Sequence, residues 1–304
     1  MNSGSAPSVS PVSAAHPGRG PARSFVATLE MIRFSHTLFA LPFALLAAVL
    51  AAVGLPPVAT LVKILLAMVG ARSAAMAHNR LADRHLDAVN PRTASRALPA
   101  GILSARFVRI FLVASSLLFL VAAASLNRLT LILSPVALAL LFFYSYTKRF
   151  TWLSHAVLGL CLGIAPVGAW IAVRGRFDLV PILLGLAVLL WTAGFDLLYA
   201  LQDEEHDRRA GLHSIPARWG TARALVISAL LHAAMLPLLI AVWRLSGSGV
   251  LFAVGIAATA LALIYQHAIV RPGNLSRVNT AFFTANGFVS VSLAAFGIAD
   301  VLLR

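Results

Sequence analysis

Two stretches of the chain repeat polar, mostly acidic side chains at every fourth residue. On a helix, this spacing places successive side chains on one face, one turn apart. Carboxylates arranged in this way suit a hard cation such as Mg²⁺, which binds one or two carboxylates and completes its shell with water and phosphate oxygens. The residues are Asn79, Asp83 and Asp87 in the first stretch and Asp203 and Asp207 in the second.

Two such faces, when they lie opposite one another, can hold two or more Mg²⁺ ions and one diphosphate between them. Nearby basic side chains would neutralise the remaining phosphate charge. Lys148 is a candidate for this role because the chain contains only two lysines. It lies four residues after Tyr144, so the two side chains share a helix face.

A solvated, salt-bridged helix end is the alternative interpretation of the first stretch, because Asp83 and Asp87 alternate with Arg80 and Arg84. The repetition of the same spacing in a second stretch favours a functional site. Asp196 also favours it, since this residue lies about two turns inside an apolar segment, where an unpaired charge is costly and functional by default.

The elements that carry these residues are predicted to be membrane-spanning helices. Of 304 residues, 60% are hydrophobic and 11% are charged, and the mean hydropathy is +0.89. This composition is typical of a membrane protein. About nine segments are apolar over the length of a membrane span. They are residues 35–54, 58–76, 107–126, 129–146, 153–173, 179–201, 222–243, 250–270 and 280–303.

We therefore expect an all-α integral membrane protein with one polytopic domain over residues 25–304. Residues 1–24 are rich in Ser, Pro, Ala and Gly, which predicts a disordered cytoplasmic tail. Cys161, the single cysteine, lies in an apolar run and is interpreted as a small buried residue.

Basic residues predict the orientation, because Lys and Arg concentrate in cytoplasmic connections. Seventeen of them lie in the tail and in the connections on one side of the membrane, and five on the other. The imbalance places the N-terminus and both acidic stretches in the cytoplasm, and we expect the membrane to be a bacterial inner membrane. Membrane topology and an anionic ligand also explain the net charge of +14 without a nucleic-acid partner, and no feature of the sequence indicates an obligate protein partner.

Three motifs in this order resemble the UbiA family of intramembrane aromatic prenyltransferases. They are Asn79-x-x-x-Asp83-x-x-x-Asp87, Tyr144-x-x-x-Lys148 and Asp196-x-x-Tyr199-x-x-x-Asp203-x-x-x-Asp207. The resemblance covers about residues 25–304 and includes the loop after the first motif, residues 90–101. One position departs from the family pattern. Many relatives have Asp directly after the first Asn, whereas this chain has Arg80, so the metal shell can differ in detail.

The resemblance implies nine transmembrane helices around a central cavity that two cytoplasmic loops cap. It implies Mg²⁺ as the cofactor, and a polyprenyl diphosphate, an aromatic acid and the lipid bilayer as partners. The implied metal ligands are Asn79, Asp83, Asp87, Asp203 and Asp207, and the candidate catalytic residues are these four aspartates with Lys148. The implied diphosphate contacts are Lys148, Arg149, Arg84 and Arg33, and the substrate cavity is expected to contain Arg72, Tyr144, Asp196 and Tyr199.

The implied reaction begins with departure of the diphosphate, and an electron-rich ring then attacks the carbocation-like prenyl group through carbon. The cavity wall must be dry, because water would quench the cation. Aromatic side chains can stabilise such a cation, and ordinary packing is the alternative role for each of them. The candidates are Phe142, Phe143, Trp191 and Phe195. Either Asp196 or Tyr199 is a candidate to orient the acceptor or to take its proton.

The sequence does not identify the aromatic acceptor. Residues 194–203 and 211–216 resemble a subgroup of 4-hydroxybenzoate polyprenyltransferases, which favours 4-hydroxybenzoate and quinone biosynthesis. A naphthoate-type acid on a route to menaquinone is the alternative. A polytopic ion or solute transporter is the alternative from a different class, because transporters also place charges within spans. It predicts ionisable residues near the middle of several spans, whereas here the acids cluster at two cytoplasmic sites.

Overall fold

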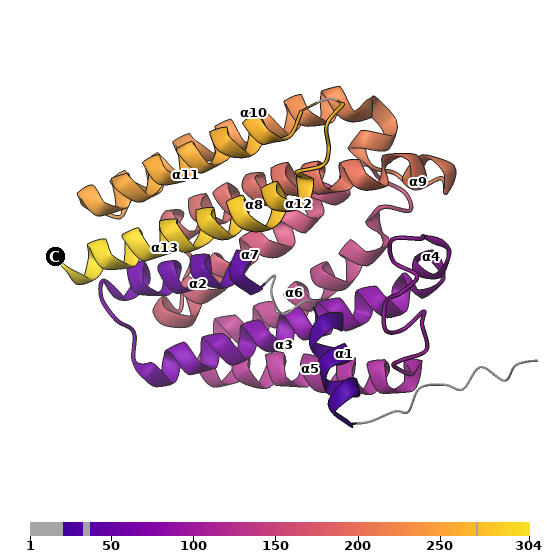
Figure 1. Cartoon of the computed structure of the whole chain (residues 1–304). Helices are drawn as coiled ribbons and strands as arrows, with labels where there is room; N and C mark the ends of the chain where they lie inside the picture. The colour runs from indigo at the N-terminus through magenta and orange to yellow at the C-terminus, as the bar shows by residue number, and fades with distance from the viewer. Residues whose placement is uncertain (1–20, 33–36, 272) are drawn as a thin grey trace, which may run out of the picture.

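The computed structural model describes residues 21–32, 37–271 and 273–304, and the regular elements in these ranges are helices (Figure 1). The long helices are α2 (Thr37–Ala52), α3 (Val58–Ala82), α5 (Ala105–Leu126), α6 (Arg128–Thr147), α7 (Ser154–Arg174), α8 (Leu179–Ala200), α10 (Ile215–Leu245), α11 (Val250–Ile269) and α13 (Asn286–Leu302). The short elements are α1 (Pro21–Met31), α4 (Arg84–Val89), the 3₁₀ turn η2 (Leu201–Asp203), α9 (Glu204–Arg209), α12 (Val278–Thr280) and the π-helical turn η3 (Ala281–Ala285).

Eight helices in the described ranges are long and apolar enough to cross a membrane. Helix α2 is the ninth candidate, and its apolar part is shorter. The predicted all-α fold with about nine spans is therefore confirmed. The tail predicted over residues 1–24 lies mostly outside the described residues, and α1 begins within it at Pro21, a residue suited to the first position of a helix.

Two helices extend past the apolar segments that predicted them. Helix α3 continues to Ala82, so Asn79 belongs to the last turn of a membrane helix. Helix α10 already begins at Ile215 and bends at Gly220, which has φ 79° and ψ 166°. Glycine adopts this positive φ without a steric penalty. The bend explains why the apolar pattern begins later than the helix.

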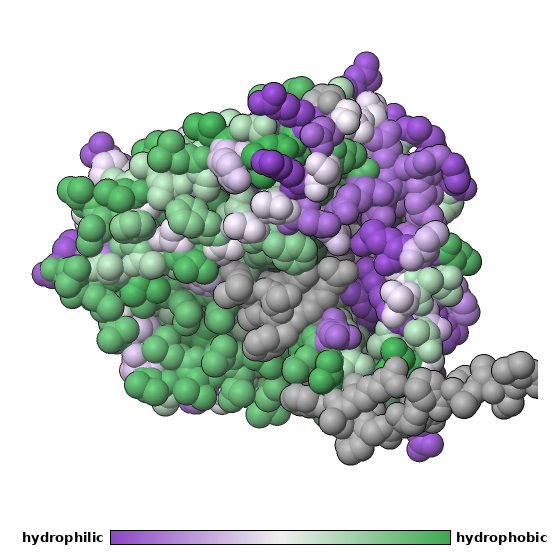
Figure 2. All heavy atoms as spheres, viewed as in Figure 1, coloured by the Kyte–Doolittle hydropathy of each residue, from purple (hydrophilic) through white to green (hydrophobic). Residues whose placement is uncertain are grey.

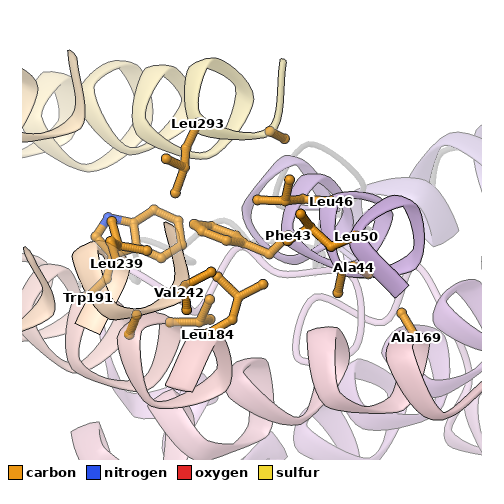
Figure 3. Close-up of a cluster of buried hydrophobic side chains, with 14 of the residues drawn as sticks. Phe43, Ala44, Leu46, Leu50, Ala169, Leu184, Trp191, Leu239, Val242 and Leu293 are labelled. Carbon is orange, nitrogen blue, oxygen red and sulfur yellow. The ribbon is translucent and has the colours of Figure 1, made fainter. Parts of the chain in front are cut away.

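The largest apolar core lies where α2 packs among α8, α10 and α13 (Figure 3). Phe43 and Leu46 of α2 point toward Trp191 of α8, Leu239 of α10 and Leu293 of α13, and all five side chains are fully buried. The ring centroids of Phe43 and Trp191 are 5.1 Å apart. Inside a bilayer, such side chains stabilise the helix bundle through close van der Waals packing, because the surrounding lipid is as apolar as the core. The core fixes the position of α8, which carries part of the second acidic stretch.

Helices α7 and α8 approach one another closely through glycines. A Cβ atom at Gly163 would lie 2.5 Å from the carbonyl oxygen of Gly185, and one at Gly159 would lie 2.4 Å from that of Leu189. Real Cβ atoms do not reach such distances, so only glycine permits this approach. The two helices are antiparallel, because a short connection joins them. Residues before Gly159 therefore face residues after Leu189.

Hydrophobic side chains cover most of the face seen in Figure 2, over the long helices. Exposed examples are Ile110, Val121, Val136 and Leu261. Hydrophilic side chains gather at the end of the molecule where Figure 1 places α4 and α9. A broad apolar surface of this kind is stable in lipid and not in water, so the chain is an integral membrane protein with a polar cap at one end.

Candidate active site

A cavity of about 630 Å³ opens between the long helices at this polar end. One part of its lining is polar and comes from both acidic stretches and from the loop after the first of them. The rest is apolar and includes Ile64, Leu133, Leu158 and Leu162. The cavity therefore joins a charged mouth to a hydrocarbon interior.

Most of the predicted site residues meet at this one cavity. Its lining contains Arg72, Asn79, Asp83, Asp87, Tyr144, Lys148, Arg149, Asp196, Tyr199, Asp203 and Asp207. Arg84 is exposed outside this lining, and its Nε donates to Nε2 of His85 at 2.9 Å. Arg33 lies outside the described residues. Contact of Arg84 and Arg33 with a diphosphate stays a prediction.

Neither acidic stretch is the single continuous helix that its spacing predicts. The first crosses a break at Asp83, where α3 ends and α4 begins, and the second crosses the 3₁₀ turn η2. The four-residue register survives the first break because helical backbone hydrogen bonds continue across it. The N–H of Asp83 donates to the carbonyl oxygen of Asn79 at 2.9 Å, and the N–H of Asp87 donates to the carbonyl oxygen of Asp83 at 2.7 Å. These bonds keep the three side chains of the first stretch at the same cavity.

The first acidic stretch is held by an amide and by three arginines. Asn79 Nδ2 donates to Asp83 Oδ2 at 2.9 Å, and Arg149 Nη2 donates to Asp83 Oδ1 at 3.0 Å. Asp87 is only 6% exposed and accepts from Arg96 Nη1 at 2.6 Å. The Asp87 carboxylate is thus buried, with Oδ1 hydrogen-bonded to Arg96 and Oδ2 3.8 Å from Arg80 Nη1.

The second acidic stretch is paired with basic residues from elsewhere in the chain. Arg92 Nε donates to Asp203 Oδ1 at 2.8 Å, and Nη2 donates to Oδ2 of the same carboxylate. Arg92 Nη1 also donates to the Tyr199 hydroxyl at 3.3 Å. Lys148 Nζ lies 3.3 Å from Asp207 Oδ2. Two separate pairings therefore hold this stretch, that of Arg92 with Asp203 and Tyr199 and that of Lys148 with Asp207.

Lys148 and Arg149 are adjacent residues that contact opposite acidic stretches. Lys148 pairs with Asp207 of the second stretch, and Arg149 pairs with Asp83 of the first. The end of α6 therefore lies between the two acidic faces, which places both faces and both cations around one volume. An anionic ligand at this position can contact both basic side chains.

Burial acts on the acidic side chains in a way that favours a cation. Burial raises the pKa of Asp83 above its usual range, and the hydrogen bond and charge of Arg149 oppose this rise. Asp87 Oδ2 is buried and has no hydrogen-bond partner among the described residues, with Arg80 Nη1 at 3.8 Å. A metal cation beside these oxygens would offset the cost of burying the Asp83 charge and would give Asp87 Oδ2 a direct partner.

The donor set fits Mg²⁺. It consists of carboxylate and amide oxygens, which are the ligands that this ion prefers. Within the described ranges, no three side chains from His, Cys, Asp and Glu are grouped closely enough to hold a metal ion by themselves. Carboxylate and amide oxygens suit an ion that binds one or two carboxylates and completes its shell with phosphate oxygens and water.

Aromatic side chains line the cavity, but they are mostly not the predicted ones. Phe195 lies in the lining, whereas Phe142, Phe143 and Trp191 lie outside it in the part of the chain that the structure describes. Phe142 stacks on His78, Phe143 is 48% exposed, and Trp191 belongs to the core. The helix period explains the position of Phe142, because a residue two positions before Tyr144 points to the opposite side of α6.

The lining includes aromatic residues that the sequence did not single out. Phe39 and Phe282 pack with Phe195 at centroid distances of 5.4 Å each. Tyr199 lies 4.3 Å from Phe282. These four rings form a continuous aromatic wall beside the second acidic stretch.

Three further polar residues were missed as site residues. Arg92 and Arg96 are spaced four residues apart directly after the first acidic stretch, and this spacing was the available signal. His155 Nδ1 lies 2.7 Å from Asp196 Oδ2. No local pattern indicates this contact, because 41 residues separate the partners.

A helical membrane protein in which two acidic faces and several cations surround the mouth of an apolar cavity has the architecture of an intramembrane prenyltransferase. The chain belongs to the UbiA prenyltransferase family, whose family model matches residues 40–288. It is therefore a prenyltransferase, and the resemblance seen in the three motifs is confirmed.

Similar proteins include two curated 4-hydroxybenzoate octaprenyltransferases. The protein of Vibrio cholerae serotype O1 is 32% identical over 274 residues, which cover 90% of this chain and 96% of the relative. The protein of Yersinia pseudotuberculosis serotype IB is 37% identical over 204 residues, which cover 67% and 70% of the two chains.

Solved structures of UbiA homologues share the fold. The apo structure of a homologue from Aeropyrum pernix K1 has a TM-score of 0.80 and 38% identity, and the match covers 88% of this chain and 98% of that one. A homologue from Archaeoglobus fulgidus bound to GPP and Mg²⁺ has a TM-score of 0.72 and 23% identity, with 90% and 99% coverage. At this identity, the second likeness establishes the fold alone.

Proposed function

We propose that this protein transfers a polyprenyl group from a polyprenyl diphosphate to a ring carbon of an aromatic acid, in a Mg²⁺-dependent step of quinone biosynthesis. One observation carries the proposal. Lys148 and Arg149 lie between two facing acidic stretches, at the mouth of a cavity whose interior is apolar. This arrangement suits a ligand with a diphosphate head and a hydrocarbon tail.

The acidic residues would hold the metal, and the basic residues would hold the phosphates. Asn79, Asp83 and Asp87 on one side and Asp203 and Asp207 on the other are the proposed ligands. Bound Mg²⁺ would neutralise charge on the diphosphate and so make it a better leaving group. Lys148 and Arg149 would donate hydrogen bonds to the phosphate oxygens as charge develops there.

Binding of the donor requires the present ion pairs to rearrange. Arg149 and Lys148 now donate to Asp83 and Asp207. A diphosphate offers the two basic side chains stronger acceptors, and cations offer the carboxylates a replacement partner. The exchange keeps every buried charge compensated, because each carboxylate and each basic group changes its partner without losing one.

The apolar part of the cavity would hold the prenyl chain and exclude water. The rings of Phe39, Phe195, Tyr199 and Phe282 lie beside the second acidic stretch, near the place where the C–O bond of the donor would break. Their π-faces can stabilise a developing carbocation. A dry wall also prevents capture of that cation by water.

4-Hydroxybenzoate is the acceptor that we favour. The curated relatives from Vibrio cholerae and Yersinia pseudotuberculosis carry this acceptor in their names. Arg72 lies in the cavity lining, about two turns before Asn79 on α3, and supplies a cationic partner for the acceptor carboxylate. A naphthoate-type acid offers the same carboxylate and a ring hydroxyl, so it remains the second candidate.

We propose that the protein resides in a bacterial inner membrane with the mouth of the cavity facing the cytoplasm. The two curated relatives are bacterial, and the excess of Arg and Lys lies in the connections at the end that carries the acidic stretches. This orientation gives the site access to soluble aromatic acids in the cytoplasm.

The test uses membranes that contain the protein, Mg²⁺, a radiolabelled prenyl diphosphate, and either 4-hydroxybenzoate or a dihydroxynaphthoate. We expect a lipid-soluble labelled product with 4-hydroxybenzoate and loss of this product with EDTA or in the Asp203→Asn variant. Glu205→Gln is the matched control, because this carboxylate of α9 is exposed. Product with the naphthoate alone would move the assignment to the second candidate, and no product with either acid would overturn the proposed function.

A further inference from the structure

A short π-helical turn, η3 (Ala281–Ala285), carries one ring of the aromatic wall. Phe282 lies in the cavity lining and is 5% exposed. Its ring centroid is 4.3 Å from that of Tyr199 and 5.4 Å from that of Phe195. The next residue, Phe283, is 40% exposed. A change of register by one residue at this turn would move Phe282 away from the wall, because one residue corresponds to about 100° of rotation.

The backbone of η3 needs hydrogen-bond partners from outside the turn. A π turn interrupts the regular bonding of a helix, and in lipid no water replaces the partners that are lost. Gln266 of α11 and Asn286 of α13 supply them, and both side chains are fully buried. Gln266 Nε2 donates to the carbonyl oxygen of Ala281 at 3.0 Å, and Asn286 Nδ2 donates to that of Phe282 at 2.9 Å. Two amides from different helices thus support the turn.

The oxygen of the Asn286 amide connects the turn to α8. Trp191 Nε1 donates to Asn286 Oδ1 at 3.0 Å. The partners determine the orientation of this amide, because an indole N–H can only donate and a backbone carbonyl oxygen can only accept. Trp191, Phe195 and Tyr199 follow one another at four-residue spacing on α8 and share one face. Asn286 therefore fixes the register between that face and Phe282.

The wall that this turn completes reaches the charged mouth of the cavity. Tyr199 contacts the ring of Phe282, and its hydroxyl accepts from Arg92 Nη1 at 3.3 Å. Arg92 also donates to Asp203 of the second acidic stretch. Phe282 is therefore separated by one ring from the polar groups at which we place the diphosphate. The first carbon of the prenyl group would be released beside this part of the wall.

We propose that Gln266 and Asn286 are positioning residues that hold the ring of Phe282 against the prenyl cation, so that the aromatic acid captures it and water does not. The inference rests on the proposed function, since it needs a donor that ionises in this cavity. Neither amide belongs to the described cavity lining, so both act through the turn that they support. A ring beside the cation stabilises it and occupies the space that water would need.

Two reactions compete once the donor ionises, and both balance without an oxidant or a reductant. The C–O bond of the donor breaks, and its electron pair leaves with the diphosphate. In transfer, ring electrons form the new C–C bond, and the hydrogen on the substituted ring carbon leaves as a proton to the diphosphate. In hydrolysis, a water oxygen bonds to the same prenyl carbon and loses a proton to the diphosphate, which gives the prenyl alcohol. The ratio of alcohol to prenylated acid therefore measures how well the wall excludes water.

The experiment measures both products from a radiolabelled prenyl diphosphate, with 4-hydroxybenzoate or a dihydroxynaphthoate, whichever the parent protein prenylates. The variants are Gln266→Leu, Asn286→Leu, Phe282→Leu and the double variant Gln266→Leu/Phe282→Leu. We expect each single variant to lower kcat for transfer and to raise the alcohol ratio by about 3- to 30-fold, the range that cation–π stabilisation spans. We expect the KM for the donor to stay within about 2-fold of the parent, because the groups at the diphosphate are unchanged.

Ser290→Ala is the matched control for the two amides. Ser290 lies one turn after Asn286 on α13, is fully buried and donates to the carbonyl oxygen of Gly287, outside η3, at 3.1 Å. We expect the kcat and the alcohol ratio of this variant to match those of the parent. Thermal stabilisation by geranyl diphosphate with Mg²⁺ reports that each variant is folded and binds the donor. If Asn286→Leu does not fold, Gln266→Leu carries the test, since it retains the Asn286 amide.

The double variant separates the positioning of Phe282 from a general structural role. If Gln266 acts through Phe282, replacing it costs little more in the Phe282→Leu background, because the two residues form one unit. Two unrelated contributions would instead multiply.

Three results would overturn the inference while leaving the proposed function intact. One is a Gln266→Leu variant whose kcat and alcohol ratio match those of the parent. Another is a lower kcat without a rise in the alcohol ratio, which would show a structural role only. The third is a double variant in which the two losses multiply. Failure of the parent protein to prenylate either acid would instead overturn the proposed function, and this inference with it.

Discussion

Arg92 and Asp203 form a two-pronged ion pair across the mouth of the cavity. Nε donates to Oδ1 at 2.8 Å and Nη2 donates to Oδ2, although 111 residues separate the partners. Arg92 belongs to the loop after the first acidic stretch, and Asp203 belongs to the second stretch. The pair therefore ties the two acidic stretches together at the mouth of the cavity. The same planar fork that grips a carboxylate also fits a phosphate group.

Replacement of Arg92 by Ala is predicted to weaken donor binding. The variant loses charge-assisted hydrogen bonds worth about 1.5–3 kcal/mol each in a typical protein, so we expect the KM for the prenyl diphosphate to rise about 10- to 100-fold. Arg92→Lys keeps the charge but loses the fork, and we expect it to recover only part of the affinity. Steady-state transfer at varied donor concentration measures both effects.

Arg208→Ala is the control for this series. Arg208 pairs with Glu204 on α9 and lies outside the described cavity lining. We expect its KM for the donor to match that of the parent protein. An Arg92→Ala variant with an unchanged KM would show that the pair with Asp203 is structural only.

Loss of Arg149 and loss of Arg84 are predicted to affect donor binding very differently, although the family resemblance implied that both residues contact the diphosphate. Arg149 lines the cavity and donates to Asp83, whereas Arg84 is exposed and donates to His85. We expect Arg149→Ala to raise the donor KM about tenfold or more and Arg84→Ala to change it less than about 2-fold, as expected for an exposed charge. Equal losses in the two variants would show that α4 moves toward the donor on binding.

The spans and most of the site residues could be predicted because their signals are local. Apolar runs of membrane length mark the helices, and four-residue spacing marks one helix face. The breaks at Asp83 and at η2 left little trace in the sequence, because both stretches keep their spacing across a change of helix. The contacts of Arg92 with Asp203 and of His155 with Asp196 depend on how distant segments pack, which no local pattern contains.

Local sequence patterns also fail to predict which aromatic side chains line the cavity, even within a single helix. Phe142 and Phe143 lie beside the predicted cavity residue Tyr144 in the sequence, but the helix turns about 100° per residue. Neighbours in the sequence therefore point in different directions, and both phenylalanines lie outside the described lining. Phe39 and Phe282 reach the cavity from α2 and η3, which lie far from the motifs in the sequence.

The glycine contact between α7 and α8 is predicted to be intolerant of larger side chains. A Cβ at Gly159 would lie 2.4 Å from the carbonyl oxygen of Leu189, so Gly159→Leu must push the two helices apart. We expect a loss of stability of roughly 1–3 kcal/mol, as for other overpacked interiors. Thermal unfolding in detergent measures the change as a lower Tm.

Gly168→Ala is the matched control on the same helix, because a Cβ there would meet nothing within 4 Å. We expect its Tm to equal or exceed that of the parent, since alanine favours the helix over glycine. A Gly159→Leu variant as stable as Gly168→Ala would contradict the close packing of α7 on α8 and, with it, the geometry that brings His155 to Asp196.

The orientation in the membrane is predicted by the distribution of Arg and Lys, and single cysteines can test it. The native Cys161 is buried and contributes little background. We expect a membrane-impermeant maleimide to label Arg176→Cys, in the exposed connection between α7 and α8, in intact spheroplasts. We expect Ser95→Cys, in the loop after the first acidic stretch, to be labelled only after the membrane is permeabilised. The reverse pattern would place the mouth of the cavity on the outer side of the membrane, away from soluble aromatic acids in the cytoplasm.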